Sequence, residues 1–328
     1  MGKRAIAVAL GIAAWTGLTG LSVGTAAAQD YPTRTVTLVV PYPPGGGVDT
    51  LARVVADKLS ASLGHQVIVD NRVGGSGLVG TRSVVRAAPD GYTLILGHSG
   101  SIAINSKLYA NAGFDPSKDF TPIGLFASMP VALLAHPTFP AKTIGEVVAI
   151  AKKEHGKLNI GTSAVGTGGY MSAELFKSET GVQATIVPYK GTAQIMNDLL
   201  GNQVPVGFGV LPPAMGNLAA GTLKAIAVLD ARRFSLLPDV PTADESGLPG
   251  FESVLHYGLL GPAGMPRPIV DKLNKALRDV AARDDIRKRI NTEGGDPMSS
   301  TPEEYAADIA KETAKWGALI SKLNLNVK

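Results

Sequence analysis

The amino-acid sequence predicts an α/β protein with two units, each built on a mostly parallel sheet flanked by helices. Three observations support this fold class. Strand-like and helix-like segments alternate along the chain, the alternation occurs twice, and each unit contains a glycine-rich loop between a strand and a helix. Alternating strands and helices favour parallel sheets whose crossover connections are right-handed.

The first unit opens with a short apolar strand followed by a clearly periodic helix. Apolar residues from Leu51 to Leu63 recur at three- and four-residue spacing, and Gly64 stands where a helix commonly ends. The expected elements are a strand at Val36–Val40, a helix at Thr50–Leu63, a strand at Gln66–Asp70, a helix at Leu78–Ala88 and a strand at Tyr92–Leu96.

The second unit repeats this order after a long apolar extended run at Phe120–Ala135. Thr143 and Glu146 have the spacing of a capping box, which predicts the N-terminus of a helix. The expected elements are a helix at Val147–Glu154, a strand at Leu158–Gly161, a helix at Met171–Thr180, a strand at Ala184–Val187, a helix at Ala193–Gly201 and a strand at Val204–Phe208.

The C-terminal third is expected to return the chain to the first unit. Two extended regions, near 120–135 and 224–260, are the predicted crossings, which places residues 29–127 and 256–328 in one lobe and 128–255 in the other. Two helices are expected to close the chain, at Pro268–Arg283 and from Pro302, where Thr301 and Glu304 form a second capping box.

Residues 1–28 have the pattern of a secretory signal peptide and are not expected to belong to the fold. Lys3 and Arg4 precede an apolar stretch from Ala5 to Val23, and small residues up to Ala28 mark the expected cleavage point. The alternative is a membrane anchor, but threonine and glycine interrupt the apolar stretch and no second spanning segment follows. We therefore expect a mature chain in the bacterial periplasm.

Composition argues against several classes of protein. The chain has no cysteine, so it can hold neither a disulfide nor a zinc–thiolate site. Removing the two positive charges of Lys3 and Arg4 lowers the formal net charge from +4 to +2, which argues against a nucleic-acid partner. Gly75–Gly80 matches the pattern GxGxxG, but the next strand does not end in an acidic residue, so no dinucleotide or other cofactor is expected.

Glycine-rich loops at strand ends form the candidate site. The loop Tyr42–Asp49 joins a strand to a helix, and the loop Thr162–Gly169 repeats that arrangement in the second unit. Free backbone N–H groups at a helix start can hold an anion without a buried lysine or arginine. The loops Gly97–Ser101 and Pro188–Thr192 leave their strands in the same sense. A cleft lined by these loops is therefore expected to bind a carboxylate or dicarboxylate.

Several of these loop residues also have a purely structural interpretation, and both interpretations stay open. Asp49 stands where a helix N-cap belongs, and Ser163 and Thr167 can cap the second helix instead of contacting a ligand. Tyr42 can be an exposed ring or a wall of the cleft. His98 can be an ordinary polar loop residue.

Catalysis is not predicted. Ser99 lies between Gly97 and Gly100 as in a nucleophile elbow, but position 101 is serine where that motif needs glycine. The histidines are scattered and form no HExxH pair for zinc. A secreted hydrolase that uses Ser99 is kept only as a lesser alternative.

Five segments together make the chain resemble the Bug family, the extracytoplasmic solute receptors of tripartite tricarboxylate transporters. These segments are Val39–Asp49, Asp70–Gly77, Ala88–Leu94, Val187–Gly191 and Leu237–Thr242. The resemblance runs from Tyr31 to the C-terminus. It implies a two-lobed periplasmic binding fold of type II (a Venus flytrap), no catalysis, a monomer, and delivery of a carboxylate to membrane permease subunits. A sensor that feeds a signalling system is the alternative.

The resemblance also implies site residues, and one position departs from the family pattern. Ser99 and Asn105 match that pattern, whereas Gly209 stands where the family often has an acidic residue. We therefore expect a carboxylate, mono- or dicarboxylate, with an uncharged or aromatic tail rather than an amino acid. The predicted ligand-binding residues are Tyr42, Gly45, Gly46, Gly47, Asp49, His98, Ser99, Asn105, Ser163, Ala164, Gly166, Thr167, Gly168, Tyr189, Phe208 and Gly209.

Overall fold

The structure is a computed structural model that describes residues 31–45, 47–189 and 192–327. The predicted signal peptide, with its cleavage point after Ala28, lies outside the described residues, as do Gly46 and the segment 190–191. Within these described ranges, no helix is both long enough and apolar enough to span a bilayer.

The described residues form a mixed α/β fold around one sheet with the strand order β2-β1-β3-β9-β4-β7-β5-β6, to which β8 and β10 add by pairing with β4. The strands are β1 (Val36–Val40), β2 (Val67–Asn71), β3 (Thr93–His98), β4 (Phe120–Ala135), β5 (Asn159–Thr162), β6 (Thr185–Pro188), β7 (Val206–Val210), β8 (Lys224–Val228), β9 (Val254–Pro262) and β10 (Asp296–Pro297).

Two groups of parallel strands lie at the two ends of this sheet. Strand β1 pairs in parallel with β2 and β3, and β5 pairs in parallel with β6 and β7. These are the two alternating units that the sequence predicts. The predicted α/β fold class is therefore confirmed.

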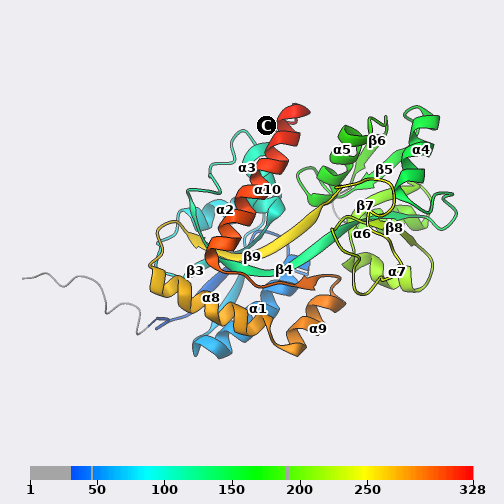
Figure 1. Cartoon of the computed structure of the whole chain (residues 1–328). Coiled ribbons are helices and arrows are strands. Elements are labelled where there is room, and N and C mark those ends of the chain that lie inside the picture. Colours follow the sequence, from blue (N-terminus) through cyan, green and yellow to red (C-terminus); the bar gives the residue numbers. More distant parts are fainter. Residues whose placement is uncertain (1–30, 46, 190–191, 328) are drawn as a thin grey trace, which may run out of the picture. The chain divides into compact units, whose positions relative to one another are not determined.

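Strand β4 joins the two groups. Its first part, Phe120–Pro130, pairs antiparallel with β9, and its last part, Val131–Ala135, pairs with β7 and β8. Figure 1 shows β4 and β9 running side by side from one group toward the other. The extended run expected at Phe120–Ala135 is thus a single strand with the predicted bounds.

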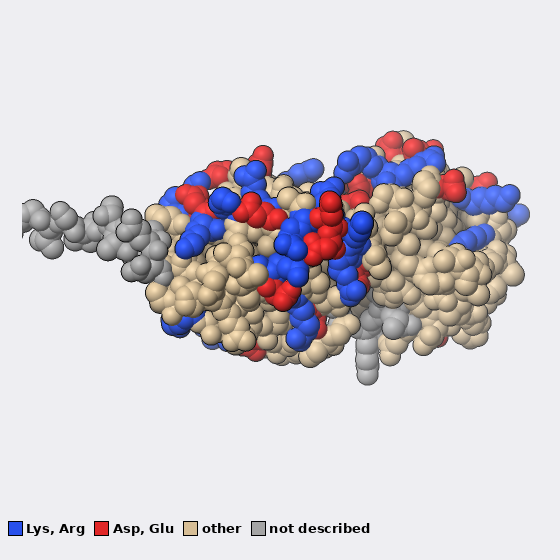
Figure 2. Space-filling model, turned by 90° about the horizontal axis from the view of Figure 1, so that it is seen from below, with Lys and Arg blue, Asp and Glu red and all other residues tan. Residues whose placement is uncertain are grey.

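Helices cover both ends of the sheet (Figure 1). They are α1 (Gly47–Leu63), α2 (Leu78–Val85), α3 (Asn105–Leu108), α4 (Ile144–Glu154), α5 (Gly168–Thr180), α6 (Thr192–Leu200), α7 (Met215–Ala219), α8 (Arg267–Ala281), α9 (Asp284–Thr292) and α10 (Pro302–Lys322). On the face in Figure 2, acidic and basic side chains lie interspersed, as on an ordinary solvated surface.

The predicted start of α1 needs correction, and the helices α3, α7 and α9 were not predicted. Helix α1 begins at Gly47 and not at Thr50, because the glycine-rich loop enters the helix directly. The helix α9 was not predicted, because its charged sequence offers only Ile286 and Ile290 as buried residues. By contrast, α10 begins as expected, with Thr301 and Glu304 forming both hydrogen bonds of the capping box.

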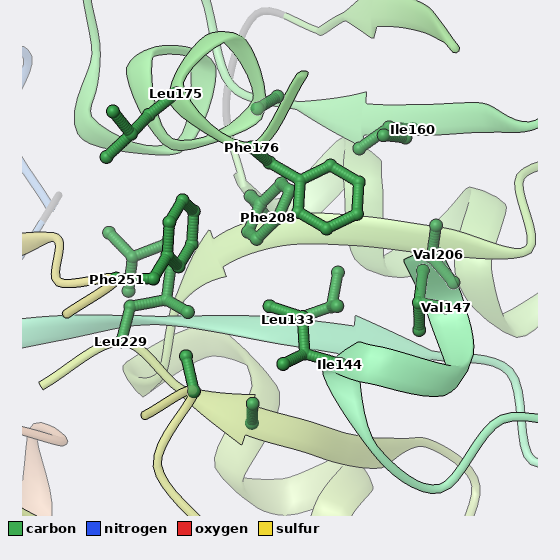
Figure 3. Close-up of a cluster of buried hydrophobic side chains, with 14 of the residues drawn as sticks. Leu133, Ile144, Val147, Ile160, Leu175, Phe176, Val206, Phe208, Leu229 and Phe251 are labelled. Carbon is green, nitrogen blue, oxygen red and sulfur yellow. The ribbon is translucent and has the colours of Figure 1, made fainter. Parts of the chain in front are cut away.

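Aromatic rings fill the core beside β7. The rings of Phe176, Phe208 and Phe251 have centroids 5.7 to 6.5 Å apart and pack with Leu133 and Val206. Figure 3 shows the three rings converging from α5, β7 and the segment before β9. Burial of each such ring contributes roughly 1.5–3 kcal/mol, so this cluster is a principal source of stability in the second parallel group.

Helix α10 packs closely on the crossing strand β9. The ring of Tyr305 is buried against Gly258, where an added Cβ would overlap it. Two residues earlier on the same strand, His256 Nδ1 lies 2.7 Å from Asp308 Oδ1 of the same helix. Because Gly258 has no side chain, α10 can pack closely on β9 at this position.

Replacing Gly258 by alanine should destabilise the fold by about 1–3 kcal/mol, because the added methyl group forces Tyr305 and α10 outward. Urea unfolding followed by far-UV circular dichroism measures the change. The control is Gly216→Ala in α7, where an added Cβ meets nothing within 4 Å. That variant should be unchanged or up to about 1 kcal/mol more stable. Equal stability of the two variants would contradict the packing argument.

Candidate ligand-binding site

Asp49 organises the first glycine-rich loop from the inside. Its Oδ2 accepts the Gly45 N–H at 2.9 Å and Arg53 Nε at 2.9 Å. Its Oδ1 accepts Asn71 Nδ2 at 2.9 Å and a guanidinium NH₂ of Arg53 at 3.0 Å. Burial alone would raise the pKa of Asp49, but the hydrogen bonds from Arg53, Gly45 and Asn71 outweigh it and lower that pKa.

This arrangement corrects the expected role of Asp49. The residue lies in the first turn of α1 and reaches back to Gly45, so it is not the N-cap. With only 2% of its surface exposed and four donors on its oxygens, its carboxylate shapes the loop. Gly45 and Gly47 are exposed, and Gly45 adopts φ +81°, which a glycine takes without strain.

A cluster of three rings supports the loop that follows β3. The rings of Tyr42 and His98 are stacked with centroids 5.1 Å apart. The ring of Tyr257, a residue of β9, is tilted against that of His98, and their centroids are 5.3 Å apart. His98 Nδ1 accepts the Gly100 N–H at 2.9 Å, which assigns the ring proton to Nε2. Burial lowers the pKa of His98 to about 4, so the ring is neutral at neutral pH. Burial also raises the pKa of Tyr42 above its ordinary value.

Ser99 forms a hydrogen bond that links two strands. Its Oγ accepts the backbone N–H of His256 at 3.1 Å, which connects the end of β3 to β9. In the described residues the Ser99 hydroxyl makes no hydrogen bond to the ring of His98 or of His256, so no base contacts it. A nucleophile needs such a base within hydrogen-bond reach.

Hydroxyl groups organise the second glycine-rich loop. Thr167 is the N-cap of α5 and accepts the Tyr170 N–H at 3.4 Å. Its Oγ1 donates to the Ala164 carbonyl at 2.7 Å and lies 2.6 Å from Ser163 Oγ. Since the Thr167 proton goes to Ala164, the Ser163 hydroxyl donates to Thr167. The first N–H groups of α5 have no partner inside the helix and are left for an acceptor.

The second loop lies against α3, which follows β3 in the chain. An added Cβ on Gly166 would come within 3.0 Å of both Asn105 Oδ1 and Leu108 Cδ2. Asn105 Nδ2 donates to the Ser76 carbonyl at 2.7 Å, and within the described residues Asn105 Oδ1 is buried without a hydrogen-bond partner. An unsatisfied buried acceptor costs about 1–3 kcal/mol, and an ordered water commonly supplies the missing donor.

The comparisons with known proteins agree with this architecture. The family model described as "Tripartite tricarboxylate transporter family receptor" matches residues 51–325. The chain belongs to this receptor family. Its resemblance to the Bug proteins is thereby confirmed, and the members of the family are solute-binding receptors, not enzymes.

Named relatives and solved structures support the same assignment. The receptor is 30% identical to protein BugT of Bordetella pertussis over 302 residues, covering 92% of this chain and 93% of BugT. It is similar to the periplasmic binding protein BugD, with a TM-score of 0.78, 35% identity, and coverage of 91% of this chain and 100% of that one.

Two similar structures hold carboxylates. Rpa4515 of R. palustris with adipate has a TM-score of 0.80 and 36% identity, covering 89% of this chain and 98% of its own. MatC (Rpa3494) from Rhodopseudomonas palustris with bound malate has a TM-score of 0.78 and 35% identity, covering 88% and 100%.

Three predicted site residues of the receptor are buried in its core or bonded to another of its residues. Phe208 is fully buried with its ring in the aromatic core, so that ring is not available to a ligand. Tyr189 donates its hydroxyl proton to Asp198 Oδ2 at 2.6 Å, and burial, together with Asp198, raises the pKa of Tyr189 to about 12. Gly209 is a buried residue of β7 paired with Ala132.

Sequence reasoning missed the residues that support the loops. Arg53 stands four residues after Asp49, a spacing at which helical side chains meet, so this contact could have been found. No spacing in the sequence predicted the contact between Asn71 and Asp49. Gly169 is a further required glycine, because an added Cβ would lie 2.6 Å from the Phe208 carbonyl and 3.1 Å from Ser163 Oγ. Gly168 is similarly tight against Leu255, at 2.7 Å.

Replacing Asp49 by asparagine should destabilise the receptor by about 1–3 kcal/mol, because the donors of Arg53 and Gly45 lose a charged acceptor. Chemical denaturation measures the change. Asp57→Asn on the same helix is the matched control, since its carboxylate is 71% exposed and forms an exposed ion pair with Lys58. That control should stay within about 0.5 kcal/mol of the wild type.

Acidification should destabilise the receptor partly through His98. The folded pKa of about 4 lies below the unfolded value of 6.5, so the unfolded state binds the proton first and stability is lost as pH falls from 6.5 to 4. This contribution is up to about 3 kcal/mol. His98→Asn should lower stability at every pH but flatten its dependence on pH in this window. Parallel profiles of the two proteins in urea titrations would refute the burial effect.

Proposed function

We propose that this receptor captures a small organic carboxylate in the periplasm, between the loops Tyr42–Asp49 and Ser163–Gly169, and presents it to the permease of a tripartite tricarboxylate-type transporter. Membership of the receptor family supports the class of function, and the neighbours with adipate and malate support a carboxylate ligand. Family membership likewise supports a periplasmic location.

The observation that carries the proposal is the construction of the second loop. The N-terminus of α5 begins with Gly168 and Gly169, whose backbone N–H groups have no partner inside the helix, and Ser163 lies beside Gly169. Such N–H groups favour an anion through both hydrogen bonds and the helix dipole. Each hydrogen bond to a charged group contributes roughly 1.5–3 kcal/mol, so a few of them offset the cost of burying one carboxylate.

The opposite wall is expected to come from the first group of strands. The neutral rings of Tyr42 and His98 would give this wall an aromatic, uncharged face, and the unpaired Asn105 Oδ1 would accept a hydrogen bond from the ligand or a bound water. Gly209 leaves no carboxylate at its position for an ammonium group. A carboxylate with an uncharged or aromatic tail therefore fits better than an amino acid.

Capture would involve closure of two lobes, residues 29–127 with 256–328 against residues 128–255, about the crossing strands β4 and β9. A hinge of this kind lets loops from both lobes contact one ligand. Closure would place the neutral Tyr42–His98 wall opposite the donors at the start of α5.

Calorimetric titration with adipate, malate, an aromatic monocarboxylate and glutamate tests the site. Ser163→Ala should weaken carboxylate binding about tenfold, because the hydroxyl that bonds to Thr167 and holds the loop at the start of α5 is lost. Gly166→Ala should also weaken it, because φ +84° strains alanine and the methyl group meets Asn105. The control Ser235→Ala removes an exposed hydroxyl and should bind as the wild type does.

Unchanged carboxylate affinity in both Ser163→Ala and Gly166→Ala would rule out the two-loop site. Tight binding of glutamate would instead contradict the proposed tail. Native mass spectrometry of protein purified without denaturation weighs any metabolite that remains bound. Delivery to a permease is tested separately, by carboxylate uptake into vesicles that contain the permease subunits, with and without the purified receptor.

A further inference from the structure

A second polar cavity lies on the face of β9 that is turned away from the Tyr42–His98 stack. Successive side chains of a strand point to opposite faces. Tyr257 contacts His98, whereas His256 bonds to Asp308 of α10, so His256 marks the other face. There a cavity of about 230 Å³ lies between α10, the strands β4, β9 and β10, and the segment that follows β8.

Three residues in register form the floor of this cavity. Asp296 of β10 pairs with Ser128 of β4, and Ser128 pairs with His256 of β9. Directly opposed residues of antiparallel strands project from the same face. The carboxylate of Asp296, the hydroxyl of Ser128 and the imidazole of His256 therefore form a row beneath the cavity.

Ser128 is the least expected member of the row. Only 7% of its surface is exposed, and its Oγ makes no hydrogen bond to any residue in the described ranges. Ser128 lines the cavity, where its hydroxyl is available to a ligand.

Carboxylates dominate the interior of the cavity. Across the described chain neither Asp296 nor Asp230 makes an ion pair, and the one hydrogen bond of Asp230 Oδ1 is a long 3.4 Å contact from the backbone N–H of Arg232. Burial and the nearby charge of Asp230 raise the pKa of Asp296, and together they outweigh the charge of Arg232, which lowers it. Glu312 is 6% exposed and accepts the indole N–H of Trp316.

The basic groups around the cavity are either occupied or at its rim. Lys315 Nζ donates to the Glu252 carbonyl at 2.6 Å, and His256 is bonded to Asp308. Arg232 and Lys311 are exposed at the mouth. Burial would lower the pKa of His256, yet Asp308, Glu312 and Asp230 together raise it, as expected where the potential is negative.

We propose that this cavity binds a small organic primary ammonium ion, held by Asp296, Asp230 and the Ser128 hydroxyl. A primary ammonium group has three N–H donors and no acceptor, and these residues offer it two carboxylates and one hydroxyl oxygen. The residues in the described ranges include no group of three or more histidine, aspartate or glutamate side chains arranged for a metal ion, which favours an ammonium ion over a divalent cation.

Titration with propylammonium chloride, followed by ¹H–¹⁵N NMR at constant ionic strength, tests this site. Saturable shifts are expected at the backbone amides of Ser128, His256 and Asp296. Tetramethylammonium chloride is the matched probe, because it carries the same charge without N–H donors, and it should produce no saturable shift. Equal responses to the two salts would show that the cavity senses only ionic strength and would overturn the proposal.

Variants separate the site from general electrostatics. Asp296→Asn should weaken propylammonium binding about tenfold or more, and Ser128→Ala should weaken it several-fold, because each removes one acceptor. Asp239→Asn removes an equal charge from an exposed loop and should bind as the wild type does. Thermal unfolding checks that each variant is folded. Wild-type affinity in both cavity variants would reject the proposal.

Discussion

The antiparallel pairing of β4 with β9 is the interaction on which the rest of the structure depends. The two parallel groups lie at the two ends of the sheet, and β4 and β9 are the long strands that join one group to the other. The two faces of strand β9 also make different contacts. Tyr257 supports the ring stack on one side, while His256 and Gly258 receive α10 on the other.

The two glycine-rich loops solve the same physical problem in different ways. A loop with uncovered backbone needs something to hold its shape, since glycine offers no side chain for packing. In the first loop a buried carboxylate, Asp49, holds Gly45 and the start of α1. In the second loop the hydroxyls of Ser163 and Thr167 do so without a charge. A neutral support at α5 leaves the positive end of that helix uncompensated, which suits an incoming anion.

Sequence patterns predicted the two parallel groups, the bounds of β4 and the start of α10, because these depend on local periodicity and capping. They could not predict the role of Asp49, since Asn71 reaches it from 22 residues away through the fold. The core position of Phe208 could not be predicted either. Its strand is buried on both faces, so the sequence does not show which side chains face the core and which face the cleft. Helix α9 escaped notice because charged residues surround its two buried isoleucines.

The order of strands also affects the sequence of events during synthesis. Strand β3 emerges early, yet its antiparallel partner β9 follows roughly 160 residues later. At about 5–20 residues per second, β3 therefore remains an open edge for on the order of ten seconds or more. An unpaired apolar edge is a template for intermolecular association. A sheet built from consecutive neighbours would not leave this edge open until residues 254–262 arrive.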